Sequence, residues 1–106
     1  MTECIQLTTT VETRQDADAL ARLVLEKRLA ACVQVSSCDS FYYWQGSIEQ
    51  AEERKLVMKT TARLYSQLEK CILEHHPYDL PEILAVPVPF CSRDYLDWLV
   101  GELKKE

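Results

Sequence analysis

The alternation of apolar and polar positions divides the first 44 residues into a strand, a helix and further strand-like runs. Residues 4–10 (CIQLTTT) are rich in β-branched side chains and alternate, with Ile5 and Leu7 on one side, which predicts a strand. Residues 31–35 (ACVQV) and the aromatic run 40–44 (SFYYW) also have strand character. Between them, residues 16–28 carry apolar side chains at helical spacing: Ala17, Leu20, Ala21 and Val24.

The segment 47–60 is ambiguous from its residues alone. Gln45-Gly46 offers a turn before it, because glycine adopts positive φ without strain. Its many glutamates, glutamines and lysines favour a helix, yet its apolar residues do not keep a period of 3.6. Ile48, Leu56 and Met58 instead share the parity of one strand face. Strand and helix therefore both remain open.

The last part of the chain predicts helix, strand and helix. Residues 61–75 form a helical pattern that Pro77 ends, with one face marked by Leu64, Leu68, Ile72 and His75. Residues 82–88 (EILAVPV) predict a strand, and Pro87 places its end near a sheet edge. Ser92 can cap a final helix, whose expected buried face is Tyr95, Leu96, Leu99 and Leu103. If 47–60 is a strand, the order is βαββαβ plus a helix, the α+β ferredoxin-like plan.

Composition and charge narrow the class of protein. A chain of 106 residues with 47% hydrophobic side chains predicts a single domain, 1–106, with a proper core. The net charge of −5 and the lack of a basic cluster argue against a nucleic-acid partner. No apolar run approaches the ~18 residues of a membrane span, so no membrane partner is expected. Phosphate-cradling glycine loops are absent, since the chain has two glycines.

The cysteines and the N-terminal segment together predict a compartment. The sequence begins MTECIQL, without a basic region followed by an apolar one, so no secretory signal is expected there. Five cysteines are an odd number, which argues against a complete set of disulfides. We therefore expect a reducing, cytoplasmic setting with free thiols. No motif gives a role to Cys4, Cys38, Cys71 or Cys91.

Five segments in order carry a family resemblance that covers nearly the whole chain: EKRLAACVQV, SFYYWQGSIE, ERKLVMKTT, HHPYDLPEILAVPV and YLDWL. They resemble the CutA family of divalent-cation tolerance proteins. Two positions depart from the family pattern: Cys91, where glycine is usual, and Ser47, where lysine is common. Cys91 puts the local backbone in question, because cysteine disfavours positive φ.

The resemblance implies a fold and an assembly. It makes 47–60 a strand, paired with 31–44 in a long hairpin, within a ferredoxin-like subunit that assembles as a compact homotrimer. Strands of about a dozen residues exceed the usual length of ~3–10 residues. A small core cannot cover such a ribbon, and docking copies around a closed axis would remove its exposed edges.

The resemblance also implies a copper site. In CutA proteins the positions of Cys32 and His76 lie near the subunit boundary, and thiolate with imidazole favours Cu(I). The alternative is that Cys32 packs and His76 caps its helix. Cys71 and His75 share an i, i+4 spacing that can bind metal. For that second pair a buried thiol and a core histidine are the better interpretation.

A second set of residues is implied to gather in the inter-subunit cleft: Trp44, Glu53, Lys59, Tyr78 and Glu82. The set could hold a small anion, with Lys59 as the charged contact, because subunit clefts commonly bind ligands. Packing is the simpler interpretation of Trp44 and Tyr78, since aromatic residues are enriched at interfaces. For Glu53 and Lys59 the simpler interpretation is a cross-strand ion pair.

Two functional hypotheses remain after an enzyme is rejected. Cys32 and His76 could pair as nucleophile and base, yet nothing in the sequence supplies an orienting group or an oxyanion loop. The first hypothesis is a trimeric tolerance protein that binds copper or other divalent metal ions at inter-subunit clefts. The alternative is a signalling or scaffold trimer similar to the PII-type regulators, which would bind a small anionic metabolite through Lys59 and Trp44.

Overall fold

The structure, a computed structural model, describes residues 3–105 and has an α+β architecture. Its elements are β1 (Cys4–Val11), α1 (Arg14–Glu26), β2 (Cys32–Trp44), β3 (Ser47–Thr61), the 3₁₀ turn η1 (Ala62–Leu64), α2 (Tyr65–His75), β4 (Leu84–Val88) and α3 (Arg93–Glu102). The ferredoxin-like prediction is confirmed, and the ambiguous segment is a strand. None of the helices among the described residues is long and apolar enough to cross a membrane.

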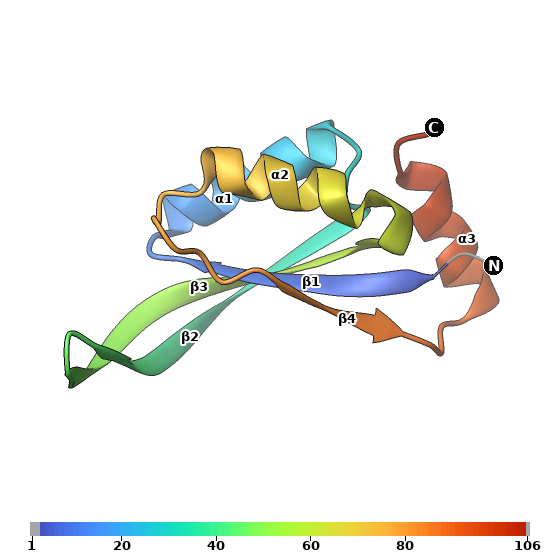
Figure 1. Cartoon of the computed structure of the whole chain (residues 1–106). Helices are drawn as coiled ribbons and strands as arrows, with labels where there is room; N and C mark the ends of the chain where they lie inside the picture. The colour runs from blue at the N-terminus through green and yellow to red at the C-terminus, as the bar shows by residue number, and fades with distance from the viewer. Residues whose placement is uncertain (1–2, 106) are drawn as a thin grey trace.

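The four strands form one antiparallel sheet in the order β2-β3-β1-β4. Helices α1 and α2 lie together on one face of this sheet, and α3 lies at its end (Figure 1). On β1, Leu7 stands opposite Met58 of β3 and Ala85 of β4. Residues directly opposite one another point to the same face, so this register directs the apolar side chains of three strands toward the helices.

The hydrophobic core fills the space between the sheet and α1 and α2. Thr13 begins α1 by accepting a hydrogen bond at its hydroxyl from the Asp16 amide, at 3.1 Å. The helix starts and ends two residues earlier than predicted, yet its expected core positions are buried or half-buried. The fully buried side chains include Leu7, Val11, Val24, Leu56, Met58, Leu64, Leu68, Ile72 and Leu99. Each contributes roughly 1.5–3 kcal/mol through burial of apolar surface.

Part of the β2–β3 ribbon extends beyond the rest of the sheet (Figure 1). The pairing of β1 with β3 ends at Val11 opposite Arg54, whereas β2 and β3 remain paired as far as Trp44 opposite Ser47. We call residues 38–53 the protruding hairpin. Its turn has Gln45 at φ 50° and Gly46 at φ 86°, and two positive φ values are what the tight turn of a twisted hairpin requires.

Helix α3 covers the opposite end of the sheet. Leu99 and Leu103 are buried as predicted, and Leu96 is half-buried. The prediction that Tyr95 belongs to the buried face is wrong, because its side chain is 36% exposed and its ring packs under the Lys59 ammonium at 5.6 Å. Ser92 occupies the N-cap position, but its side chain makes no capping hydrogen bond.

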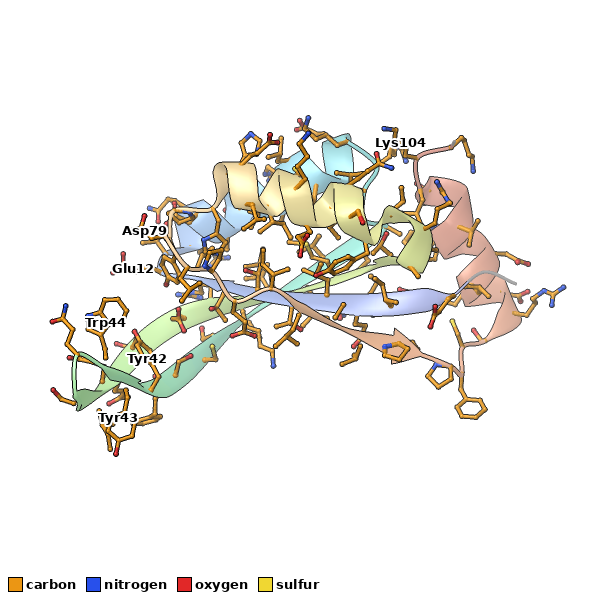
Figure 2. All side chains as sticks on the ribbon, viewed as in Figure 1. Glu12, Tyr42, Tyr43, Trp44, Asp79 and Lys104 are labelled. Carbon is orange, nitrogen blue, oxygen red and sulfur yellow. The ribbon has the colours of Figure 1, made fainter. Side chains whose placement is uncertain are left out.

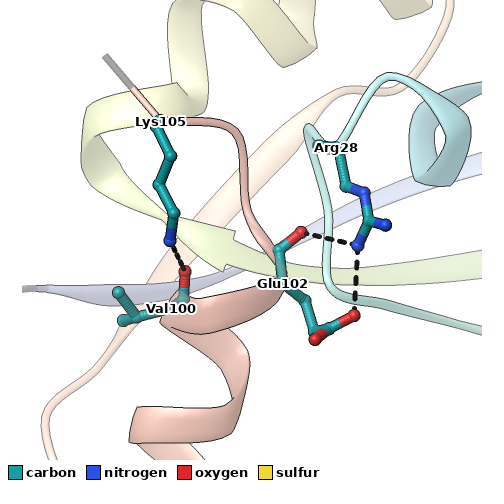
Figure 3. Close-up of polar contacts among 4 residues, drawn as sticks. All are labelled: Arg28, Val100, Glu102 and Lys105. Carbon is teal, nitrogen blue, oxygen red and sulfur yellow. Dashed lines mark hydrogen bonds and ion pairs between the residues drawn. The ribbon is translucent and has the colours of Figure 1, made fainter.

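The turn after α1 ties the end of α3 to the helical layer. Arg28 has φ 59°, and its carbonyl accepts a hydrogen bond from the Lys104 amide at 2.8 Å. Its guanidinium donates to the carbonyl and the carboxylate of Glu102, at 3.3 and 3.1 Å (Figure 3). Within residues 3–105 only Arg28 and Gln45 combine positive φ with a side chain. Cys91 therefore adopts an ordinary backbone, which removes the question that its departure from the family pattern raised.

Candidate functional site

His76 ends α2 and turns its ring toward β1. Its backbone leaves the helical region at φ −75° and ψ 137°, as expected before Pro77. Ring Nδ1 accepts a hydrogen bond from the Tyr78 amide at 3.1 Å. Because an amide only donates, Nδ1 must carry a lone pair, so Nε2 bears the proton and donates to the Thr10 carbonyl at 2.9 Å. Both ring nitrogens of this neutral imidazole are thus engaged.

Tyr78 continues this network to β3. Its hydroxyl donates to Oε2 of Glu53 at 2.7 Å, and its ring centroid lies 4.9 Å from that of His76. Only 9% of Glu53 is exposed, so this carboxylate is held by a charge-assisted hydrogen bond in a largely dry position. We call His76, Tyr78 and Glu53 the 76–78–53 cluster.

Burial shifts the ionisation of two cluster members. It lowers the pKa of His76 from the ordinary value of 6.5, an effect that the Thr10 hydrogen bond and the nearby Asp16 and Glu53 partly oppose. Burial raises the pKa of Tyr78, and the hydrogen bond to Glu53 acts in the same direction. Both groups are therefore held in their neutral forms at neutral pH.

The structure brings three of the predicted site residues together and leaves the other four apart. Glu53 lies six residues from Lys59 on β3, about 20 Å at the usual rise of a strand. Cys32 stands directly opposite Lys59 and is therefore equally distant from the cluster. Trp44 lies at the hairpin turn and is 57% exposed, and the exposed Glu82 precedes β4. Within one chain, the seven residues do not share a cleft.

Two simpler sequence interpretations are corrected by the structure. Glu53 and Lys59 cannot form a cross-strand ion pair, because both lie on β3 and six residues separate them. His75 is not a core histidine, because it is exposed at the end of α2, with Nδ1 2.9 Å from the Cys71 carbonyl. Cys71 itself is buried, as predicted.

The five cysteines are free and differ in accessibility. Cys4 and Cys71 are buried, and burial raises the pKa of both thiols, which makes them poor thiolates. Cys32 and Cys38 are half-buried, and Cys91 is exposed. By strand alternation Cys32 shares its sheet face with Lys59, opposite to the face of Leu7 and Met58 that α1 and α2 cover.

A cleft that no sequence pattern indicated lies at the base of the protruding hairpin. It measures about 310 Å³ and is lined by Glu12, Ser37, Cys38, Asp39, Glu52, Glu53 and Arg54. Four carboxylates make it acidic, which disfavours a small anion as its ligand. The adjacent acids Glu52 and Glu53 stand out in the sequence, but their meeting with Glu12 depends on the β1–β3 register. Residues 3–105 contain no group of three or more His, Cys, Asp or Glu placed to hold a metal ion.

Comparisons with known proteins place the chain in a family. Residues 5–102 match the family model described as CutA1 divalent ion tolerance protein. The divalent-cation tolerance protein CutA of Pyrococcus horikoshii is 37% identical over 97 residues, which cover 92% of this chain and 95% of that protein. Its Escherichia coli counterpart is 42% identical over 89 residues, which cover 83% of this chain and 80% of that protein.

Solved structures agree with these relatives. The crystal structure of CutA1 from Oryza sativa superposes with a TM-score of 0.95 at 30% identity, covering 98% of this chain and 96% of the other. The structure of CutA from Synechococcus elongatus also gives 0.95, at 36% identity, covering 98% and 93%. The chain therefore belongs to the CutA1 family of divalent ion tolerance proteins.

Proposed function

We propose that the protein acts in divalent-cation tolerance as a homotrimer that binds copper, or another divalent metal ion, in the clefts between its subunits. The proposed binding of a metal ion rests on the Cys32 thiol. It is free, half-buried, and on the sheet face that α1 and α2 leave uncovered. A thiolate there is a soft ligand suited to Cu(I).

Exposed apolar side chains support the homotrimer. Seven of them lie on the protruding hairpin and along β4, an edge strand of the sheet: Phe41, Tyr42, Tyr43, Trp44, Ile48, Leu84 and Val86, each at least 46% exposed. Others, such as Leu80 and Phe90, lie in the segments before and after β4. Figure 2 shows Tyr42, Tyr43 and Trp44 on the hairpin, away from the two helices. Apolar patches of this kind mark interaction sites, and a closed ring of copies covers them without open-ended growth.

Cys32 is better suited than His76 to be the ligand that this subunit contributes to the metal site. Both nitrogens of His76 are engaged, so binding a metal would cost its hydrogen bond to Thr10 or to Tyr78. We therefore assign His76 to holding the loop, and we expect the remaining metal ligands to come from a neighbouring subunit. We propose no catalytic step for the protein. We expect it to act in the cytoplasm, where reducing conditions would keep its free thiols available.

A Cu(I) titration against a competing chelator, under reducing conditions, tests this assignment. We expect tight binding at a fixed ratio per chain, lost in Cys32→Ser and retained in the matched control Cys91→Ser. His76→Gln should retain binding, because glutamine can both donate and accept at this position. Mass measurements of each sample should show a trimer throughout.

Two outcomes would contradict parts of the proposal. Weak binding that Cys32→Ser leaves unchanged would exclude the copper site and direct attention to the alternative, a small anionic metabolite in a cleft. A trimer that loses copper in His76→Gln as well as in Cys32→Ser would make His76 a ligand and overturn its assignment to the loop.

A further inference from the structure

The protruding hairpin depends on its base for a fixed direction. Beyond Val11 opposite Arg54, the two strands of the hairpin pair only with each other in the part of the chain that the structure describes. A two-stranded ribbon without a packed face is marginally stable in water. Yet the exposed aromatic side chains of the proposed assembly surface lie on this ribbon. Something at the base must hold it if those side chains are to meet a partner reproducibly.

The 76–78–53 cluster lies at this base and connects three segments that are distant in sequence. Glu53 is the first residue of β3 beyond the last β1 pair, and Thr10 is the penultimate residue of β1. Tyr78 donates through its hydroxyl to Glu53 at 2.7 Å and through its amide to His76 at 3.1 Å, and His76 donates to the Thr10 carbonyl at 2.9 Å. The chain of bonds thus links the start of the hairpin to the sheet through the loop that follows α2.

The loop is suited to act as a rigid support. Pro77 fixes its own φ and restricts His76, so two consecutive residues have little freedom. The rings of His76 and Tyr78 pack together at 4.9 Å, which limits the tyrosine further. Glu53 is only 9% exposed where it lines the acidic cleft, so water would replace the charge-assisted hydrogen bond from Tyr78 only in part.

We propose that Tyr78 is a positioning residue whose hydroxyl braces the protruding hairpin, so that the loop 76–78 sets the direction in which the hairpin meets a second copy of the chain. The part concerning a second copy rests on the proposed trimer. The brace itself is a property of one chain. The position of the loop thereby affects assembly, although the loop lies outside the exposed aromatic surface.

Tyr78→Phe tests the brace, because it removes one oxygen atom and retains the ring. Backbone hydrogen exchange of the full chain, read by mass spectrometry, should become about tenfold faster within residues 38–53, as the loss of a hydrogen bond to a buried carboxylate implies. Exchange in α1 and α2 should be unchanged. The trimer of this variant should dissociate at about tenfold higher protein concentration than the wild type. Tyr95→Phe, which retains the ring beneath the Lys59 ammonium, is the matched control and should change neither readout.

The outcomes separate the brace from the assembly. Unchanged exchange in 38–53 would overturn the brace, and so would an equal acceleration across α1, α2 and the hairpin, since that reports global stability. If the wild type is monomeric, the proposed trimer fails, while the local exchange difference still decides the brace. A trimer whose dissociation is unaffected by Tyr78→Phe, despite faster exchange, would overturn the coupling to assembly.

Discussion

The two halves of β3 lie in different environments. Residues 54–61 pair with β1 beneath the helices, and residues 54–59 pair with β2 as well; there Leu56 and Met58 are completely buried. Residues 47–53 belong to the protruding hairpin, where Ile48 is 65% exposed. The first half is held by apolar burial, whereas the second is held by backbone pairing and by the bond from Tyr78 to Glu53. One continuous strand can thus depend on two unrelated sources of stability.

The largest expected contrast comes from truncating one apolar side chain in each half. Leu56→Ala should lower the free energy of unfolding by about 2–5 kcal/mol, because it leaves a cavity in the core. Ile48→Ala should change the free energy of unfolding of an isolated chain by no more than about 0.5 kcal/mol, since the Ile48 side chain is exposed. Urea unfolding of dilute samples checks both values. Equal losses would contradict the division of the strand.

Two buried threonines sharpen the comparison: Thr60 lies in the packed half of β3, and Thr9 lies on β1 directly opposite Leu56. The Thr60 hydroxyl donates to the Leu29 carbonyl at 2.7 Å, so Thr60→Val should cost about 1–2 kcal/mol. The Thr9 hydroxyl is buried with no hydrogen-bond partner among residues 3–105, so Thr9→Val should stabilise the chain by about 1 kcal/mol. Thermal unfolding distinguishes the opposite signs. A loss of stability in both variants would show that the Thr9 hydroxyl has a polar partner.

The cluster at the base of the hairpin should make stability depend on pH. The pKa of His76 is lowered in the folded chain, so the unfolded chain binds more protons between that lowered value and 6.5. The contribution of His76 is therefore fully present above pH 6.5 and is lost as the pH falls through the folded pKa. Unfolding measured across this range should show the loss in the wild type. His76→Gln should lack this component, and an unchanged pH dependence in that variant would contradict the assignment.

The smallest expected effect is at the hairpin turn. Gln45 adopts φ 50°, a conformation that asparagine tolerates better than glutamine, particularly before glycine. Gln45→Asn should stabilise the hairpin by roughly 0.5 kcal/mol. Slower hydrogen exchange around residues 43–48, with no change in α2, is the expected result. Faster exchange would indicate that the glutamine side chain itself supports the turn.

The element order could be predicted because most segments bury one face. Apolar side chains recur at every second residue on the strands, as at Leu56 and Met58, because they face the core. On α2 they recur at helical spacing, at Leu64, Leu68 and Ile72, for the same reason. The segment 47–60 stayed ambiguous because its hairpin half meets no core and so carries no burial pattern. In that half, residues with high helix propensity occupy a strand. The family resemblance, and not the residues alone, identified it.

The site was less predictable because it depends on contacts that are distant in sequence. Helical spacing put His75 on the buried face, but α2 ends there, and the core does not extend under its last residue. His76 is bound instead by Thr10, which is 66 positions away, and no local pattern reports that bond. The acidic cleft likewise required the register that brings Glu12 beside Glu52 and Glu53.

The geometry of the hairpin amplifies small changes at Glu53. The turn lies seven residues beyond Glu53, so the tip is roughly 23 Å from the point where the ribbon leaves the sheet. A tilt of only about 5° at that point displaces the tip by about 2 Å. A sub-ångström rearrangement at Tyr78 is therefore enlarged along the ribbon. At the tip the shift is large enough to misalign Trp44 with a facing surface.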